Sequence, residues 1–161
     1  MYDLLGWIEA SSLGRFMRES GPWTYALVNL VHIFGIASLF GAILVLDLRL
    51  LGVGGGRPLP PLADAAIPIA KTGFMLAAAS GIGLLSANAT DYEGNPFLLI
   101  KFPAIAAGLA NAVLLGRSAA WHAARRGPAS PAQSRQLALM GAISLTAWVT
   151  AVTAGRMIGY W

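Results

Sequence analysis

The sequence predicts an all-α integral membrane protein, a four-helix transmembrane bundle preceded by a short amphipathic interfacial helix. Its 161 residues are 57% hydrophobic and 11% charged, whereas about a quarter of the residues in a soluble domain are charged. Four apolar segments reach the length of about 20 residues that a helix needs to cross a bilayer. No segment shows the period-two alternation of a transmembrane β-strand.

The four predicted spans are bounded by residues that commonly stand at helix ends. Gly21-Pro22 precedes the first span, Asn95-Pro96 opens the third, and Gly127-Pro128 precedes the fourth. We place the spans at about 23–46, 67–87, 96–116 and 137–160, within a transmembrane domain of residues 22–161.

Residues 1–21 form a separate amphipathic segment. Apolar side chains recur near helical spacing, which favours a helix at the membrane interface; they include Leu4, Leu5, Ile8 and Phe16. Charged residues interrupt the apolar run, which excludes a cleavable signal peptide; they are Glu9, Arg15, Arg18 and Glu19.

Basic residues near the span ends predict the orientation, because cytoplasmic loops carry an excess of Lys and Arg. The first and third loops hold Arg49, Arg57, Lys71, Arg117, Arg125, Arg126 and Arg135. The opposite side mixes basic residues with Glu9, Glu19, Asp91 and Glu93. We therefore expect cytoplasmic first and third loops and two periplasmic termini.

Several functional classes are excluded by composition. The chain has no cysteine, so disulfides, thiolate metal sites and iron–sulfur clusters are ruled out. Its net charge is +4, but no basic stretch is interleaved with aromatic residues as nucleic-acid binding would require. No HExxH, GxSxG or P-loop motif indicates a hydrolase or transferase. A redox activity stays open.

Small residues recur four apart along the spans, and such stripes let membrane helices pack closely. The stripes are Gly73, Ala77 and Gly81; Ala104, Gly108, Ala112 and Gly116; Ala147, Ala151, Gly155 and Gly159; and Ala37 with Gly41. They predict a compact bundle. A stripe left over would join copies into a homo-oligomer or attach the chain to a larger membrane complex.

His32 is the most informative polar residue, because it lies roughly 14 Å into the first span. An ionisable side chain at that depth costs about 2.5–3.5 kcal/mol on insertion scales. Asn29 shares its helix face. Two interpretations stay open: His32 binds a cofactor or metal ion, or it is a core histidine bonded to a neighbouring helix.

Other polar residues extend this candidate site in the periplasmic half. Lys101 and Arg156 lie about five residues from their span ends, where a long cationic side chain can also reach the interface. With Glu9, Asn29 and Met157 they form the proposed cofactor site around His32. On the other side, Asp47, Arg49 and Lys71 bracket the first loop. We expect Asp47 to form a structural ion pair with Lys71 or Arg117.

The sequence resembles an uncharacterised family of small bacterial inner-membrane proteins, domain-of-unknown-function family 6644. The resemblance rests on the runs His32-Ile33-Phe34-Gly35, Asp47-Leu48-Arg49 and Asn95-Pro96-Phe97, with Lys101 and Ala154-Gly155-Arg156. It implies four spans and a bacterial inner membrane, and it brings no established activity. Glu9, His32, Asp47 and Arg49 match the family pattern, whereas His122 departs from it.

Three functions remain as hypotheses. The first is a haem b protein with His32 as axial ligand, Lys101 or Arg156 beside the propionates and Met157 as a possible second ligand. The second is a carrier or channel-like subunit for a metal or small ion, with His32 as the metal ligand. The third is an accessory subunit of a larger membrane complex. We favour the first.

Overall fold

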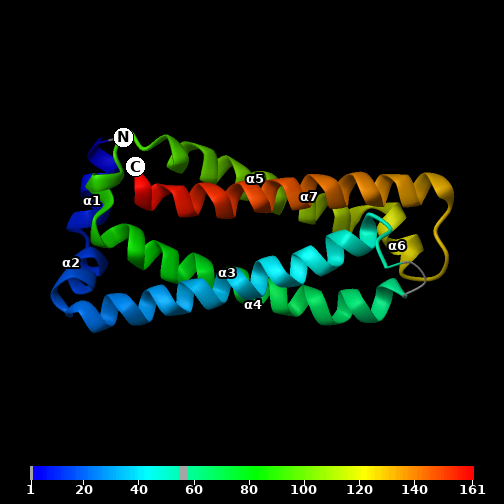
Figure 1. Ribbon diagram of the computed structural model, residues 1–161, viewed down its shortest axis with the longest axis horizontal. Helices are drawn as coiled ribbons and strands as arrows, with labels where there is room; N and C mark the ends of the chain where they lie inside the picture. The colour runs from blue at the N-terminus through cyan, green and yellow to red at the C-terminus, as the bar shows by residue number, and fades with distance from the viewer. Residues whose placement is uncertain (1, 55–57) are drawn as a thin grey trace.

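The computed structural model describes residues 2–54 and 58–161 (Figure 1). Its helices are α1 (Tyr2–Ala10), α2 (Ser12–Glu19), α3 (Pro22–Leu50), α4 (Leu59–Ala87), η1 (Ala89–Tyr92), α5 (Pro96–Arg117), α6 (Ala119–Ala124), α7 (Pro131–Met157) and η2 (Ile158–Tyr160). No strand occurs in these residues. The all-helical prediction is confirmed.

Four helices are long and apolar enough to cross a membrane: α3, α4, α5, and α7 together with η2. Two of them begin earlier than predicted. Pro60 lies in the first turn of α4, where a proline is tolerated because its missing N–H would have no helical partner. Ser130 and Gln133 form a reciprocal capping box that starts α7 at Pro131.

The N-terminal segment contains two short helices where one was predicted. Ser11 separates them, and its hydroxyl accepts a hydrogen bond from Gly14 N at 3.1 Å, which caps α2. Gly14 packs closely on α4, since a Cβ there would lie 2.7 Å from the Ser86 carbonyl oxygen. Both helices therefore rest on the bundle, at the end where the two chain termini lie (Figure 1). We call this the terminal end.

The spans form two antiparallel pairs, α3 with α4 and α5 with α7, and α3 also packs on α7. The first pair is in backbone contact: a Cβ on Gly35 would lie 2.6 Å from Ala77 N, and one on Gly73 would lie 2.8 Å from Gly35 O. The Gly73–Ala77–Gly81 stripe thus packs as predicted.

The predicted stripe on the first span is wrong. Ala37 and Gly41 are exposed, and Gly35 and Leu39 are buried. Two residues along a helix correspond to a rotation of about 200°, so a stripe displaced by two positions faces away from the partner helix. The spacing of small residues alone did not identify the buried face.

The stripes of the other pair pack over part of their length. A Cβ on Gly108 would lie 2.9 Å from the Trp148 indole, and Ala147 and Ala151 are buried. Gly116 and Gly159, at the ends of the predicted stripes, have no atom within 4 Å of an added Cβ. Along these two stripes, close packing therefore includes Gly108, Ala147 and Ala151 but not Gly116 or Gly159.

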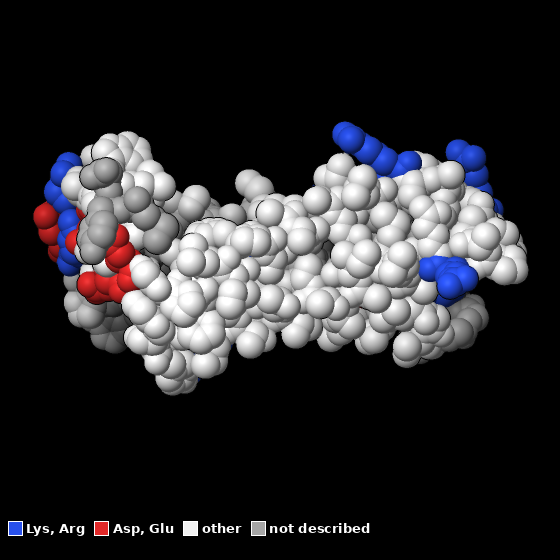
Figure 2. Space-filling model, turned by 90° about the horizontal axis from the view of Figure 1, so that it is seen from above, with Lys and Arg blue, Asp and Glu red and all other residues white. Residues whose placement is uncertain are grey.

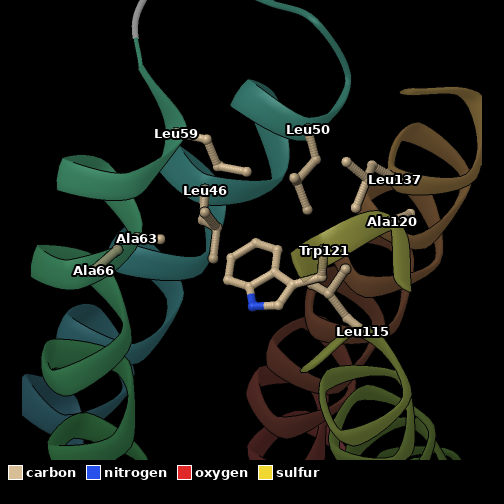
Figure 3. Close-up of a cluster of buried hydrophobic side chains, with 9 residues drawn as sticks. All are labelled: Leu46, Leu50, Leu59, Ala63, Ala66, Leu115, Ala120, Trp121 and Leu137. Atoms are coloured by element: carbon tan, nitrogen blue, oxygen red, sulfur yellow. The ribbon is translucent and has the colours of Figure 1, made fainter. Parts of the chain in front are cut away.

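The opposite end of the bundle, which we call the loop end, carries α6, the end of α3 and the beginnings of α4 and α7 (Figure 1). The Trp121 side chain of α6 points into an apolar cluster between the two helix pairs (Figure 3). Its neighbours are Leu46, Leu50, Leu59, Ala63, Ala66, Leu115, Ala120 and Leu137. The short helix α6 therefore joins the two pairs.

Candidate functional site

His32 is half-buried on α3 and binds α4 through one nitrogen of its ring. Nδ1 lies 2.9 Å from the Ala77 carbonyl oxygen and 3.1 Å from Ser80 Oγ. Ser80 Oγ in turn donates to the Leu76 carbonyl oxygen at 2.5 Å. Both neighbours of Nδ1 therefore act as acceptors, so Nδ1 carries the ring proton and donates it.

This arrangement leaves Nε2 of a neutral His32 with a free lone pair, because only one ring nitrogen is protonated. Nε2 makes no hydrogen bond within the described part of the chain. Nε2 is also not fully buried. Among the described residues, the fully buried side-chain nitrogen or oxygen atom that lacks a partner is Asp47 Oδ2, not His32 Nε2. Histidine ligands of metals are commonly oriented in this way, by a backbone carbonyl on the other nitrogen.

Gly81 makes room for the imidazole. A Cβ at this position would lie 3.0 Å from His32 Cε1 and 3.4 Å from Nδ1. The small-residue stripe of α4 therefore has two roles, close packing at Gly73 and space for the ring at Gly81.

Lys101 lies in the same half of the bundle and acts electrostatically on His32. Its side chain is half-buried and extends over α7, since a Cβ on Gly155 would lie 3.4 Å from Lys101 Nζ. It forms no hydrogen bond or ion pair with the residues that the structure describes. Among the predicted site residues, Lys101 is the one that the structure relates to His32.

The remaining predicted site residues have other surroundings. Asn29 and Met157 are exposed. The Arg156 guanidinium donates to the hydroxyl of Tyr160 and stacks over its ring, 4.6 Å from the centroid. Arg156 thus contacts a residue four positions further along the chain, and neither contact connects it with His32.

Glu9 joins α1 to η1. Its carboxylate accepts hydrogen bonds from Thr90 Oγ1 at 2.6 Å and from Thr90 N at 2.8 Å. The bond from the Thr90 hydroxyl, followed by the bond from the Thr90 backbone N–H, lowers the pKa of Glu9 below its ordinary value. Glu9 therefore has a structural contact at the terminal end.

The predicted ion pair of Asp47 is wrong. No ion pair joins Asp47 to Lys71 or Arg117 in the described residues, where the ion pair present links Arg125 and Asp64. Asp47 is 2% exposed and hydrogen-bonds Ser144 of α7, while Lys71 is exposed on α4. The side chain of Asp47 points toward α7, whereas Lys71 lies on a face of α4 that points away from the bundle. Arg49 lies two residues after Asp47, near the loop end.

Charges are distributed unequally between the two ends. Figure 2 shows acidic and basic residues together at the terminal end, and basic residues on the visible face of the loop end. Arg57, which contributed to the predicted charge asymmetry, lies outside the described residues. Among the described residues, no group of three or more His, Asp or Glu side chains is arranged to hold a metal ion.

The sequence matches the family of unknown function DUF6644 over residues 4–161. The chain belongs to this family. Neither the curated proteins nor the solved structures include a significant match. Membership in DUF6644 extends over essentially the whole chain, so the His32 site, the two helix pairs and α6 all lie within the family's domain.

A bond from His32 to a neighbouring helix, one of the two interpretations that the sequence left open, is present in the structure, but the groups that accept it were not identified from the sequence. Ser80 was not singled out, although it immediately precedes Gly81 of the small-residue stripe. Ser80 also lies three residues after Ala77 of the stripe and so shares its helix face, and this was an available signal. The carbonyl of Ala77 gave no such signal in the sequence, because every residue has a backbone carbonyl.

Proposed function

We propose that this DUF6644 protein binds haem b in a membrane, with His32 Nε2 as an axial ligand. The observation that carries the proposal is the hydrogen-bond pattern at Nδ1, where Ala77 O and Ser80 Oγ both accept. The pattern leaves Nε2 free and holds the ring in one orientation. Bound haem would supply reversible one-electron chemistry at its iron.

A haem suits this site better than a bare metal ion. A metal ion held only by protein needs several ligand side chains, and the described residues contain no such group. A haem supplies four nitrogen ligands itself and needs one or two from the protein. His32 alone therefore satisfies its minimum requirement.

Lys101 supports an anionic ligand in the same half of the bundle. A half-buried ammonium with no partner among the described residues is costly at membrane depth, and a haem propionate would provide the missing charge. We assign Lys101 as the cationic partner of a propionate. Arg156, already bonded to Tyr160, has a smaller role in this proposal.

His122 does not supply a second axial ligand, and exposed small residues of α3 support a homo-oligomer. His122 is on α6 at the loop end, far along the bundle from His32. Ala37 and Gly41 are exposed on α3, and small residues allow close approach of a second copy. We propose a homo-oligomer that packs through this face of α3, on the side of the helix opposite His32.

We further propose a bacterial inner-membrane location with the loop end in the cytoplasm. The basic loop end and the mixed charge of the terminal end support this orientation (Figure 2). The His32 site would then lie in the periplasmic half, where it could exchange electrons with partners on that side.

The test is the absorption spectrum of the protein purified from cells that make haem. We expect a Soret band in the wild type and in His122→Ala, and its loss in His32→Ala, because His122 is exposed on α6. A colourless wild type that contains copper or zinc would favour the ion carrier, and a colourless one without metal would favour the accessory subunit. Either result would contradict the haem proposal.

A further inference from the structure

A pocket lies at the loop end, far from His32. It has a volume of about 580 Å³, within the usual range of ligand pockets, about 300–1,000 Å³. It is formed by the end of α3, the beginning of α4, the residues that follow α6 and the first turns of α7. Nothing in the proposed function uses it.

The lining of this pocket is strongly basic. Arg49, Arg125 and Arg126 contribute to it. Arg125 is held in place from two sides, by an ion pair with Asp64 at 2.5 Å and by the ring of Trp121, 5.6 Å from its guanidinium carbon. The described lining contains these three arginines and no Asp or Glu, so the pocket keeps an excess of positive charge even with Asp64 beside Arg125.

Arg126 is the arginine most available to a ligand. It is exposed and forms no hydrogen bond or ion pair with the described residues. Ser134 adds a hydroxyl to the lining, one turn beyond the Ser130 cap of α7. The positive end of the α7 dipole points to the same region, which further favours an anion.

The rest of the lining is apolar. Leu50, Leu59 and Leu137 belong both to this pocket and to the cluster around Trp121 (Figure 3). The pocket therefore combines an arginine-rich side with an apolar base at the end of the membrane-spanning helices. Arginine recognises phosphate oxygens through paired N–H donors, and basic pockets between helix ends suit anionic headgroups.

We propose that this pocket binds a phosphate ester, and that its position at the helix ends makes an anionic phospholipid headgroup the natural source. A soluble phosphate ester has the same chemistry, so the experiment must separate the two. The proposal is independent of haem binding.

The experiment measures thermal unfolding of the full-length protein in neutral detergent during titration with phosphatidylglycerol. Phosphatidylcholine serves as the lipid control, and glycerol phosphate as the soluble probe. We expect phosphatidylglycerol to raise the unfolding temperature more than phosphatidylcholine does. If glycerol phosphate stabilises the protein as much as phosphatidylglycerol does, the ligand is a soluble ester. If phosphatidylglycerol stabilises it and glycerol phosphate does not, the ligand is the lipid.

Two variants locate the effect. In Arg126→Gln we expect the apparent affinity for phosphatidylglycerol to fall about fivefold, the factor that corresponds to about 1 kcal/mol for one basic residue. Arg135→Gln removes the same charge from the exposed first turns of α7, outside the pocket lining, and should keep the wild-type affinity. Equal effects of the two lipids, or equal losses in the two variants, would overturn the proposal.

Discussion

His32 and Asp47 are both polar residues of α3, and their different contacts give them different roles. His32 shares one nitrogen between two acceptors on α4 and leaves the other nitrogen free. Asp47 is turned into the bundle, where Ser144 is its side-chain partner and Oδ2 has none among the described residues. The first arrangement joins α3 to α4 and leaves one nitrogen for a ligand, and the second joins α3 to α7.

Glu9 gives a prediction about pH. Its hydrogen bonds with Thr90 lower its pKa from the ordinary value of 4.5. A lowered pKa in the folded state means that the contact contributes stability above pH 4.5, and that this contribution is lost as the pH falls through the folded-state value. We expect the unfolding temperature to drop in this acidic range, and Glu9→Gln to reduce the drop.

The matched control for Glu9 is Glu19→Gln, which also removes a carboxylate at the terminal end. Glu19 is exposed and makes no hydrogen bond with the described residues, so its replacement should leave the acid-dependent drop unchanged. An unfolding profile that responds equally to both substitutions would show that the Thr90 contact does not produce the pH dependence.

At the scale of single residues, the sequence predicted positions better than partners. His32 was identifiable because a buried imidazole is costly in any apolar helix. The partner of Asp47 was not, because Lys71 and Ser144 both lie at a suitable depth and only the helix rotation decides between them. The structure turns Lys71 to the outside and Ser144 to the inside.

Among the elements, the short helix α6 contributes a side chain that contacts both helix pairs. Six residues place the Trp121 indole between α3, α4, α5 and α7 at the loop end (Figure 3). Large-to-small substitution of a buried tryptophan costs about 3–5 kcal/mol. We expect Trp121→Ala to lower the free energy of unfolding by about this amount, measured by denaturant titration in mixed micelles.

Trp23→Ala is the control for this prediction, because Trp23 is 81% exposed at the start of α3. Its replacement should change stability by only about 0.5 kcal/mol. If both variants lost the same stability, the cluster around Trp121 would not be what joins the two helix pairs.

The long helices were predictable from apolar length alone, whereas their contacts were predictable only in part. Twenty or more apolar residues identify a span in any arrangement. The helix α6 was missed because six residues between Arg117 and the Arg125-Arg126 pair give no periodic signal. The Ala37–Gly41 stripe was misplaced because small residues occur on both faces of α3, and the structure buries Gly35 instead.

For the molecule as a whole, the unequal charge of its ends predicts its orientation. The chain contains no cysteine, so single cysteines can be introduced and labelled without background. In intact bacterial cells, a membrane-impermeant maleimide should label Ser20→Cys at the terminal end, and should label Ala132→Cys at the loop end only after permeabilisation. The opposite pattern would reverse the proposed orientation.

The central claim is that His32 Nε2 is a haem ligand, and imidazole rescue tests it most directly. Purified apo-protein is titrated with haem while the Soret band is recorded. We predict saturation in the wild type, loss of the band in His32→Gly, and its return when free imidazole fills the vacated position. A His32→Gly variant that keeps the wild-type spectrum without imidazole, or a wild type that binds no haem, would contradict the account.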